Sequence, residues 1–185
     1  MAIKPILFNT DMTQAILGGR KTCTRRIIKP QPTARYGAQC TKMPCQPGDV
    51  LYVRETWHKY TKLVGKGEGC HLEERYGYKA SIANSEDAAE PWKPSIHMPK
   101  EAARIWLKVT DVRVERLQDI TADGIRNEGL SSAAVHCGDV EIALKEWENL
   151  WNSTIKKSDL NRYGWGANPW VRVIEFERCD KPQEV

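Results

Sequence analysis

Short segments rich in β-branched and aromatic residues dominate the hydrophobic pattern of this chain. They cover residues 22–28, 50–57, 105–109 and 170–176. Such side chains fit a pleated, half-buried surface, so each segment predicts a strand. The predicted elements are therefore mostly short strands.

The third of these segments continues with a change of pattern. Apolar residues alternate with period two up to Val109 and then resume on the other parity at Val112 and Val114. A change of parity within a strand is typical of a β-bulge, which inserts one extra residue. We therefore expect a bulge at Thr110 and Asp111.

Three segments carry apolar residues at the spacing of a helix. The first follows Thr10, a capping residue, and ends at a Gly-Gly pair. A short second helix follows Thr121 and runs to Glu128. The third runs from 139 to 153, and its apolar stripe is formed by Val140, Ala143, Leu144, Trp147, Leu150 and Trp151.

Strands, two helices and a returning strand do not give the regular strand–helix alternation of a doubly wound sheet. The order predicts an α+β fold, a small mixed, mostly antiparallel β-barrel with helices packed at its ends. We expect one domain over residues 1–178, with a long, polar and irregular inserted connection at 58–104. Residues 179–185 are expected to form a polar C-terminal tail.

Composition narrows the class of protein. The chain has 185 residues, of which 41% are hydrophobic and 28% charged, values typical of a folded domain. No uncharged apolar run reaches the roughly 18 residues of a membrane helix, and the first residues lack a secretory apolar stretch. We therefore expect a cytoplasmic protein without a membrane partner, whose six cysteines are thiols. Protein partners and oligomeric state are not predicted.

Positive charge is concentrated near the start of the chain. The formal net charge is +4, and residues 1–30 hold six cations against Asp11 alone. Five of the cations lie between Arg20 and Lys29 without an acidic residue among them. This density is typical of an edge that contacts phosphate, although a solvated strand face has the same pattern.

Several motifs, in order along the chain, resemble a known family. The first set comprises Gly19-Arg20-Lys21-Thr22-Cys23-Thr24-Arg25-Arg26, Pro47-Gly48-Asp49-Val50-Leu51 and Ile174-Glu175-Phe176. In these the chain resembles an ASCH domain, of the PUA-like β-barrel superfamily. Similarity to phage and prophage ASCH proteins rests on Val53-Arg54-Glu55-Thr56-Trp57, Trp92-Lys93-Pro94-Ser95-Ile96-His97-Met98-Pro99 and the block from Val109-Thr110-Asp111-Val112 to Leu117-Gln118-Asp119-Ile120.

The resemblance implies a PUA-like barrel and a function on RNA or nucleosides. PUA-like proteins include RNA binders, readers of modified bases and amidohydrolases. Small ASCH amidohydrolases remove acyl groups from the exocyclic amine of cytidine with a lysine, a threonine three positions later and a distant glutamate. The resemblance thus implies Lys21, Thr24 and Glu128 as catalytic residues, the last by its position on the short helix.

The chemistry sets conditions on these residues. A threonine hydroxyl needs a neighbouring base, and a lysine serves as one where nearby cations disfavour its charge. Glu128 would either pair with Lys21 or orient the substrate amine. Side chains 21 and 24 point to opposite faces of an unbroken strand, so Lys21 must lie before the regular pleat begins.

The remaining binding residues are expected to line one basic cleft. Arg20, Arg25 and Arg26 would grip phosphates and Glu55 would line the wall. Aromatic side chains near loops can stack a base, so Trp57 and Trp92 are candidates, although many such tryptophans only cover the core rim. Polar groups for the edge of a base would come from Ser95 and His97.

Two other functions use the same residues differently. A non-catalytic reader of RNA or of a modified base would hold a flipped base in the cleft. A metal-assisted ribonuclease would need a ligand cluster, and Cys40, Cys45, Cys70 and His71 are badly spaced for a tetrahedral zinc site. No metal and no cofactor are therefore expected.

Overall fold

The computed structural model describes residues 1–33, 43–66, 69–81, 91–130 and 138–183. Five strands form one sheet in the order β1-β3-β6-β7-β2. Their bounds are Ile3–Leu7 for β1, Cys23–Ile27 for β2, Val50–Arg54 for β3, Trp106–Arg116 for β6 and Trp170–Cys179 for β7. Three of the four strand pairs are antiparallel and β1 with β3 is parallel.

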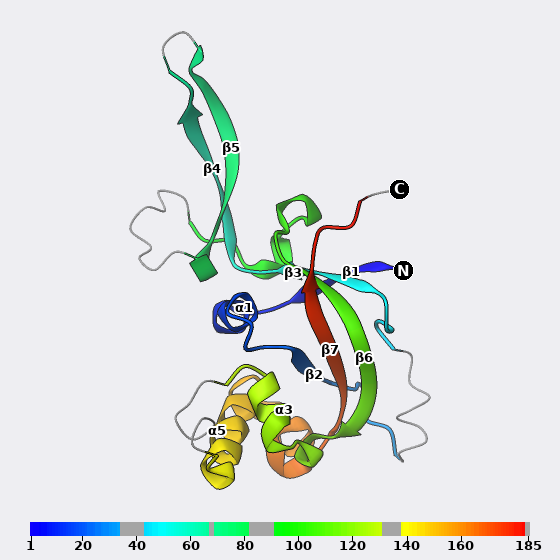
Figure 1. Ribbon diagram of the computed structural model, residues 1–185. Helices are drawn as coiled ribbons and strands as arrows, with labels where there is room; N and C mark the ends of the chain where they lie inside the picture. The colour runs from blue at the N-terminus through cyan, green and yellow to red at the C-terminus, as the bar shows by residue number, and fades with distance from the viewer. Residues whose placement is uncertain (34–42, 67–68, 82–90, 131–137, 184–185) are drawn as a thin grey trace.

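Helices pack around this sheet (Figure 1). The α-helices are α1 (Thr10–Leu17), α3 (Ala122–Asn127), α5 (Val140–Ser153) and α6 (Leu160–Tyr163). Short 3-10 helices are η2 (Lys79–Ser81), η4 (Ser95–His97), η5 (Lys100–Ala102), η6 (Leu117–Asp119), η7 (Lys157–Asp159) and η8 (Trp165–Ala167). The expected α+β class with a mainly antiparallel sheet is confirmed. Among the described residues, no helix is both long and apolar enough to cross a membrane.

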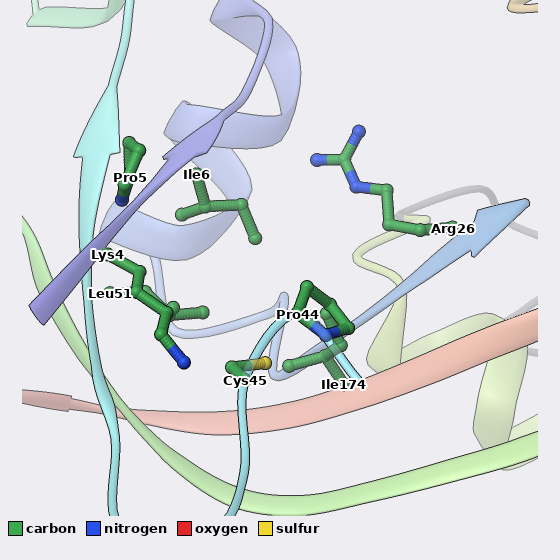
Figure 2. A pocket seen from close by; sticks show the side chains of 8 residues that line it. All are labelled: Lys4, Pro5, Ile6, Arg26, Pro44, Cys45, Leu51 and Ile174. Atoms are coloured by element: carbon green, nitrogen blue, oxygen red, sulfur yellow. The ribbon is translucent and has the colours of Figure 1, made fainter. Parts of the chain in front are cut away.

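The two edge strands of the sheet, β1 and β2, lie on either side of a small cavity (Figure 2). The Arg26 side chain of β2 donates a hydrogen bond to the Leu7 carbonyl of β1, with 2.6 Å from Nη2 to O. A side chain thus links the two edges. Closure of the sheet into a barrel by strand pairing stays a prediction.

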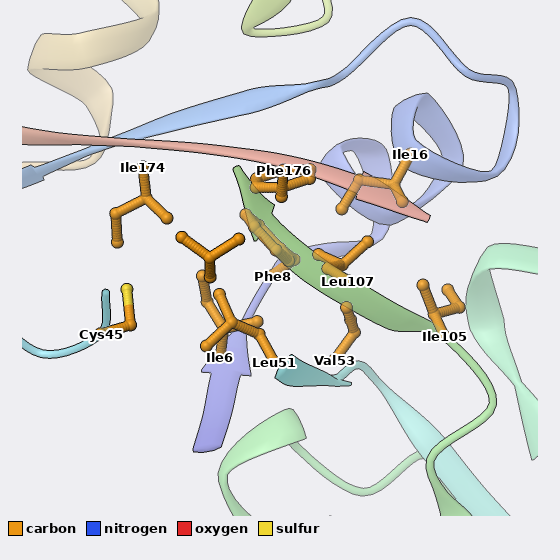
Figure 3. Close-up of a cluster of buried hydrophobic side chains, with 11 residues drawn as sticks. Ile6, Phe8, Ile16, Cys45, Leu51, Val53, Ile105, Leu107, Ile174 and Phe176 are labelled. Carbon is orange, nitrogen blue, oxygen red and sulfur yellow. The ribbon is translucent and has the colours of Figure 1, made fainter. Parts of the chain in front are cut away.

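Hydrophobic side chains cover both faces of the sheet, because successive residues of a strand point to opposite sides. In β7, Ile174 and Phe176 enter one core, whereas Val171 and Val173 enter the other. Figure 3 shows the first core, which α1 covers and which contains Ile6, Phe8, Ile16, Cys45, Leu51, Val53, Ile105, Leu107, Val109, Ile174 and Phe176. The second core lies under α3 and α5 and includes Trp147 and Trp151.

Most of the predicted elements are present. The bulge is confirmed as a register shift between Val109 and Asp111. Thr121 caps α3 as predicted. The third helix, predicted from 139, starts at Val140 and is capped by Asp139, and the first helix is capped by Asn9, whose Oδ1 accepts from Met12 N. The last strand extends three residues beyond its predicted end at 176, to Cys179.

The irregular connection predicted at 58–104 is wrong in its first part. Strands β4 (Trp57–Val64) and β5 (His71–Tyr78) form a separate antiparallel hairpin, which projects away from the five-stranded sheet (Figure 1). The outer half of the hairpin is exposed on both faces, so its sequence lacks the alternation that marks a half-buried strand. The backbone ladder from Trp57–Tyr78 to Val64–His71 joins the two strands, and Lys59 of β4 pairs with Glu74 of β5 at 2.7 Å.

The predicted strand at 50–57 is likewise divided in two. Strand β3 ends at Arg54, and Trp57 already belongs to the hairpin. The intervening Glu55 is buried and both its carboxylate oxygens accept hydrogen bonds from Arg104, at 2.9 and 3.0 Å. This buried ion pair fixes the point at which the chain leaves the sheet.

Candidate functional site

Lys21 lies between α1 and β2, outside the regular pleat. After α1 the chain turns at Gly19, which has a φ of 72°. Lys21 N donates to Ala15 O at 3.1 Å, and Lys21 forms an isolated antiparallel bridge with Glu128. Strand β2 begins only at Cys23. Lys21 therefore precedes the pleat, as the sequence argument required if it is to act with Thr24.

Glu128 is the C-terminal cap of α3, and the next residue brings it close to Lys21. Gly129 has a φ of 92°, a conformation that favours glycine. A Cβ at this position would lie 2.8 Å from Ala15 Cβ and 2.9 Å from Lys21 Cβ. Glycine thus allows the end of α3 to approach α1 and the Lys21 backbone closely.

Two cations share the Glu128 carboxylate. Lys21 Nζ donates to Oε2 at 2.5 Å and to the Glu128 carbonyl at 3.0 Å. Arg25 Nη1 donates to Oε1 at 3.2 Å. All three side chains are at most 3% exposed. Each oxygen therefore has its own charged donor in a buried environment, where such hydrogen bonds are strong.

Arg25 also holds a second carboxylate, that of Glu115 on β6. Its Nε and Nη2 donate to Glu115 Oε1 at 3.0 and 2.8 Å. Burial alone would lower the pKa of Arg25, but Glu128 and Glu115 raise it above its ordinary value. Arg25 is a fixed cation in a row that alternates in charge: Lys21, Glu128, Arg25 and Glu115.

The neighbouring thiol responds to the same charges. Burial, together with the negative charge of Glu128, raises the pKa of Cys23 to about 12, against the opposing effects of Arg25 and Lys21. Cys23 is therefore a neutral thiol at physiological pH and is unsuited to act as a nucleophile. The hydroxyl of Thr24 is the other nucleophilic group here.

A cavity of about 80 Å³ lies beside this charged row, lined by Met12, Thr24, Arg25, Arg26, Glu128, Trp147, Leu150, Trp151 and Thr154. Thr24, Arg25 and Arg26 are consecutive residues of β2 and all line this cavity. Because successive side chains of a strand point to opposite faces, all three can reach one cavity only at the edge of the strand. The cavity therefore follows the free edge of β2. A second cavity, of about 200 Å³, adjoins it and shares Glu128, Met12, Trp147 and Leu150.

The structure thus brings together Thr24, Glu128 and Arg25 of the predicted site, with Lys21 bound directly to Glu128. Arg26 also lines the smaller cavity, and its guanidinium lies 5.3 Å from the Phe8 ring centroid. Arg20 is exposed and folds back over Gly18, away from the lining of both cavities. The predicted phosphate contacts of these arginines stay predictions.

The other predicted binding residues lie at the base of the β4–β5 hairpin. Trp57 is buried and bridges to Lys93, and Trp92 stacks on His58 with ring centroids 4.5 Å apart. The remaining three are Glu55, which binds Arg104, and Ser95 and His97, which belong to η4. None of these five lines the two cavities beside Glu128. Their role in binding stays a prediction.

Sequence reasoning missed some residues of this site. Glu115 was not singled out, because only the strand register reveals that it shares a face with Arg25 across β7. Trp147 and Trp151 were predicted to be core residues, and they also form the wall of the smaller cavity. Their helical spacing signals a buried face but gives no sign of a hollow beside it.

The residues of the rejected zinc site are dispersed. Cys45 is buried, whereas Cys70 and His71 are exposed at the far end of the hairpin. Cys40 lies outside the described residues. Within the described part of the chain, no group of three or more His, Cys, Asp or Glu side chains is arranged to hold a metal ion.

Comparisons with known proteins give structural similarities only. No protein-family model and no curated protein matches the sequence. An ASCH domain from Lactobacillus crispatus is similar over 96% of this chain and 79% of its own, at 10% identity with a TM-score of 0.43. A DUF984 protein from Enterococcus faecalis is similar over 97% and 77%, at 10% identity with a TM-score of 0.47. An ASCH domain is thus among the solved structures that this chain resembles.

Proposed function

We propose that this chain is an ASCH-type protein that binds an RNA base or a modified nucleoside, and that it hydrolyses the acyl amide of N-acylated cytidine. One observation carries the proposal. Thr24 and Glu128 line the same cavity, while Lys21 Nζ lies 2.5 Å from the Glu128 carboxylate. A nucleophile and an orienting carboxylate thus line one hollow, and the proposed base is bound to that carboxylate.

In the proposed reaction, Thr24 Oγ attacks the acyl carbonyl carbon and its proton passes to Lys21, which acts as the base. The carbon–nitrogen bond of the amide then breaks, and Lys21 returns the proton to the exocyclic amine of cytidine. Water hydrolyses the resulting threonyl ester, which releases a carboxylic acid and restores the hydroxyl. Glu128 holds the Lys21 amine in position through both steps.

The charged row explains how Lys21 can act as a base beside a carboxylate. A lone lysine–glutamate pair would lose its only cation when lysine gives up its proton. Here Arg25 remains on Glu128 Oε1, so the carboxylate keeps a positive partner throughout.

The size and lining of the cavities suit a single base. Their volumes, about 80 and 200 Å³, are below the roughly 300–1,000 Å³ of pockets for drug-sized ligands. Trp147 and Trp151 provide aromatic surface next to Glu128. Such surface stacks on a base and excludes water from the charged groups.

The test is hydrolysis of N4-acetylcytidine by the purified protein. We expect Thr24→Val to abolish turnover, since it removes the hydroxyl but keeps the shape of the side chain. Thr22→Val is the matched control, because Thr22 is exposed two residues away. Turnover that survives in Thr24→Val would reject the mechanism, and tight binding of the nucleoside without turnover in the wild type would instead indicate a reader.

A further inference from the structure

A third cavity, of about 130 Å³, takes no part in the proposed reaction. It lies between β1 and β2 and is lined by Lys4, Pro5, Ile6, Arg26, Pro44, Cys45, Leu51 and Ile174 (Figure 2). Its walls are almost entirely apolar. Of the two cations among its residues, Lys4 is bound to Asp49 at 2.8 Å and Arg26 to the Leu7 carbonyl at 2.6 Å. Because the walls are mostly apolar, a hydrocarbon group suits this cavity better than a charged one.

The strand register places a residue of this cavity on the same face of the sheet as Thr24, the nucleophile of the proposed reaction. Ile174 of β7 is the direct partner of Thr24 in the antiparallel pair, so their side chains lie on the same face of the sheet. Arg26, two residues after Thr24, shares that face and lines both this cavity and the smaller one beside Glu128. The two hollows are neighbours on either side of Arg26.

We infer that this third cavity binds the acyl chain of the substrate and selects uncharged, branched hydrocarbon chains over acetyl. This inference rests on the proposed function, because it takes Thr24 as the group that attacks the acyl carbonyl. A cavity of roughly 150 Å³ lined by aliphatic side chains holds a benzene molecule. About 130 Å³ is therefore enough for a branched chain of four carbons.

The experiment compares N4-isobutyrylcytidine with N4-acetylcytidine as substrates. Each extra methylene in an apolar pocket changes kcat/KM by roughly 10- to 200-fold, so we expect the wild type to favour isobutyryl at least tenfold. Cys45→Phe fills the cavity and should reduce that ratio by a factor of ten or more. Cys179→Phe, at the end of β7 and outside the cavity, should leave the ratio unchanged.

The outcomes separate this inference from the proposed function. An unchanged ratio in folded Cys45→Phe, or in the milder filler Cys45→Met if the first variant does not fold, overturns the inference. If the wild type hydrolyses neither compound, the proposed function fails. The Kd values of the two compounds then test whether the third cavity binds the acyl chain. If isobutyrylcytidine binds more tightly than acetylcytidine and Cys45→Phe abolishes this difference, the acyl-binding cavity is supported. Equal Kd values for the two compounds overturn it.

Discussion

Two buried glutamates in this molecule differ in how their charge is met. Glu55 at the hairpin base gives both oxygens to the single guanidinium of Arg104, at 2.9 and 3.0 Å. Glu128 divides its oxygens between Lys21 and Arg25 and faces two cavities. A carboxylate held by one bidentate fork is a closed structural pair. Glu128 instead binds two cations beside a cavity, so in the proposed reaction Lys21 can transfer a proton while Arg25 stays bound to the carboxylate.

The largest effect that tests this comparison is on turnover. We expect Glu128→Gln to reduce kcat for N4-acetylcytidine by about 10²- to 10⁴-fold, the usual contribution of groups in proton transfer. Glu55→Gln should leave kcat within about twofold of the wild type, because the structural pair takes no part in the chemistry. Steady-state kinetics on both variants measures the difference. A loss in Glu55→Gln as large as in Glu128→Gln would restore Glu55 to the substrate site, as the sequence predicted.

The next effect is on stability. Arg104→Met leaves the Glu55 carboxylate buried without its partner, and loss of one member of a buried pair costs about 3–5 kcal/mol. Because the Arg104 side chain is 28% exposed, we expect the lower end, about 3 kcal/mol. For a chain of this size that lowers Tm by about 6–12 °C. Calorimetry measures the change in Tm, and Arg20→Ala, at an exposed position, is the control.

The kinetics of the same variant complete that test. Arg104→Met should hydrolyse N4-acetylcytidine at the wild-type rate below its melting temperature. A variant that is as stable as the wild type would show that the Glu55–Arg104 pair is not a structural anchor. Slow turnover in a folded variant would instead connect the hairpin base to the site.

Much of the fold was predictable from local pattern. The parity of Val109, Val112 and Val114 predicted the bulge, and the capping residue Thr121 marked the start of a helix. The hairpin was not predictable, because its outer half buries no side chains and is joined by backbone pairing. A strand without a buried face leaves no hydrophobic period in the sequence.

The candidate site was predictable only through resemblance. Lys21, Thr24 and Glu128 came from a family motif, and no local pattern connects residue 21 with a carboxylate more than one hundred positions later. No pattern in the sequence indicated that Arg25 binds Glu115 and Glu128, as it does in the structure. That pairing depends on the register of β2 and β6 on β7, which is set by the whole sheet.

The smallest effect concerns the Cys23 thiol, which reports the electrostatics of the site without any substrate. Its pKa of about 12 is above the ordinary value of 9.0, mainly through burial and then through Glu128. The raised pKa reduces the thiolate at pH 8 by about a thousandfold, so iodoacetamide should modify Cys23 at least that much more slowly than exposed Cys70.

Glu128→Gln should reduce the difference in labelling rate between Cys23 and Cys70. It removes the negative charge that, after burial, raises the pKa of Cys23, while the burial of Cys23 persists. Mass spectrometry of the labelled peptides over time measures both rates, and labelling in urea gives the reference in which burial is lost. Equal rates for Cys23 and Cys70 in the native protein would show that the interior beside Glu128 tolerates a second anion. In that case Glu128 would not set the electrostatics around Cys23, and its contrast with Glu55 would lose its electrostatic basis.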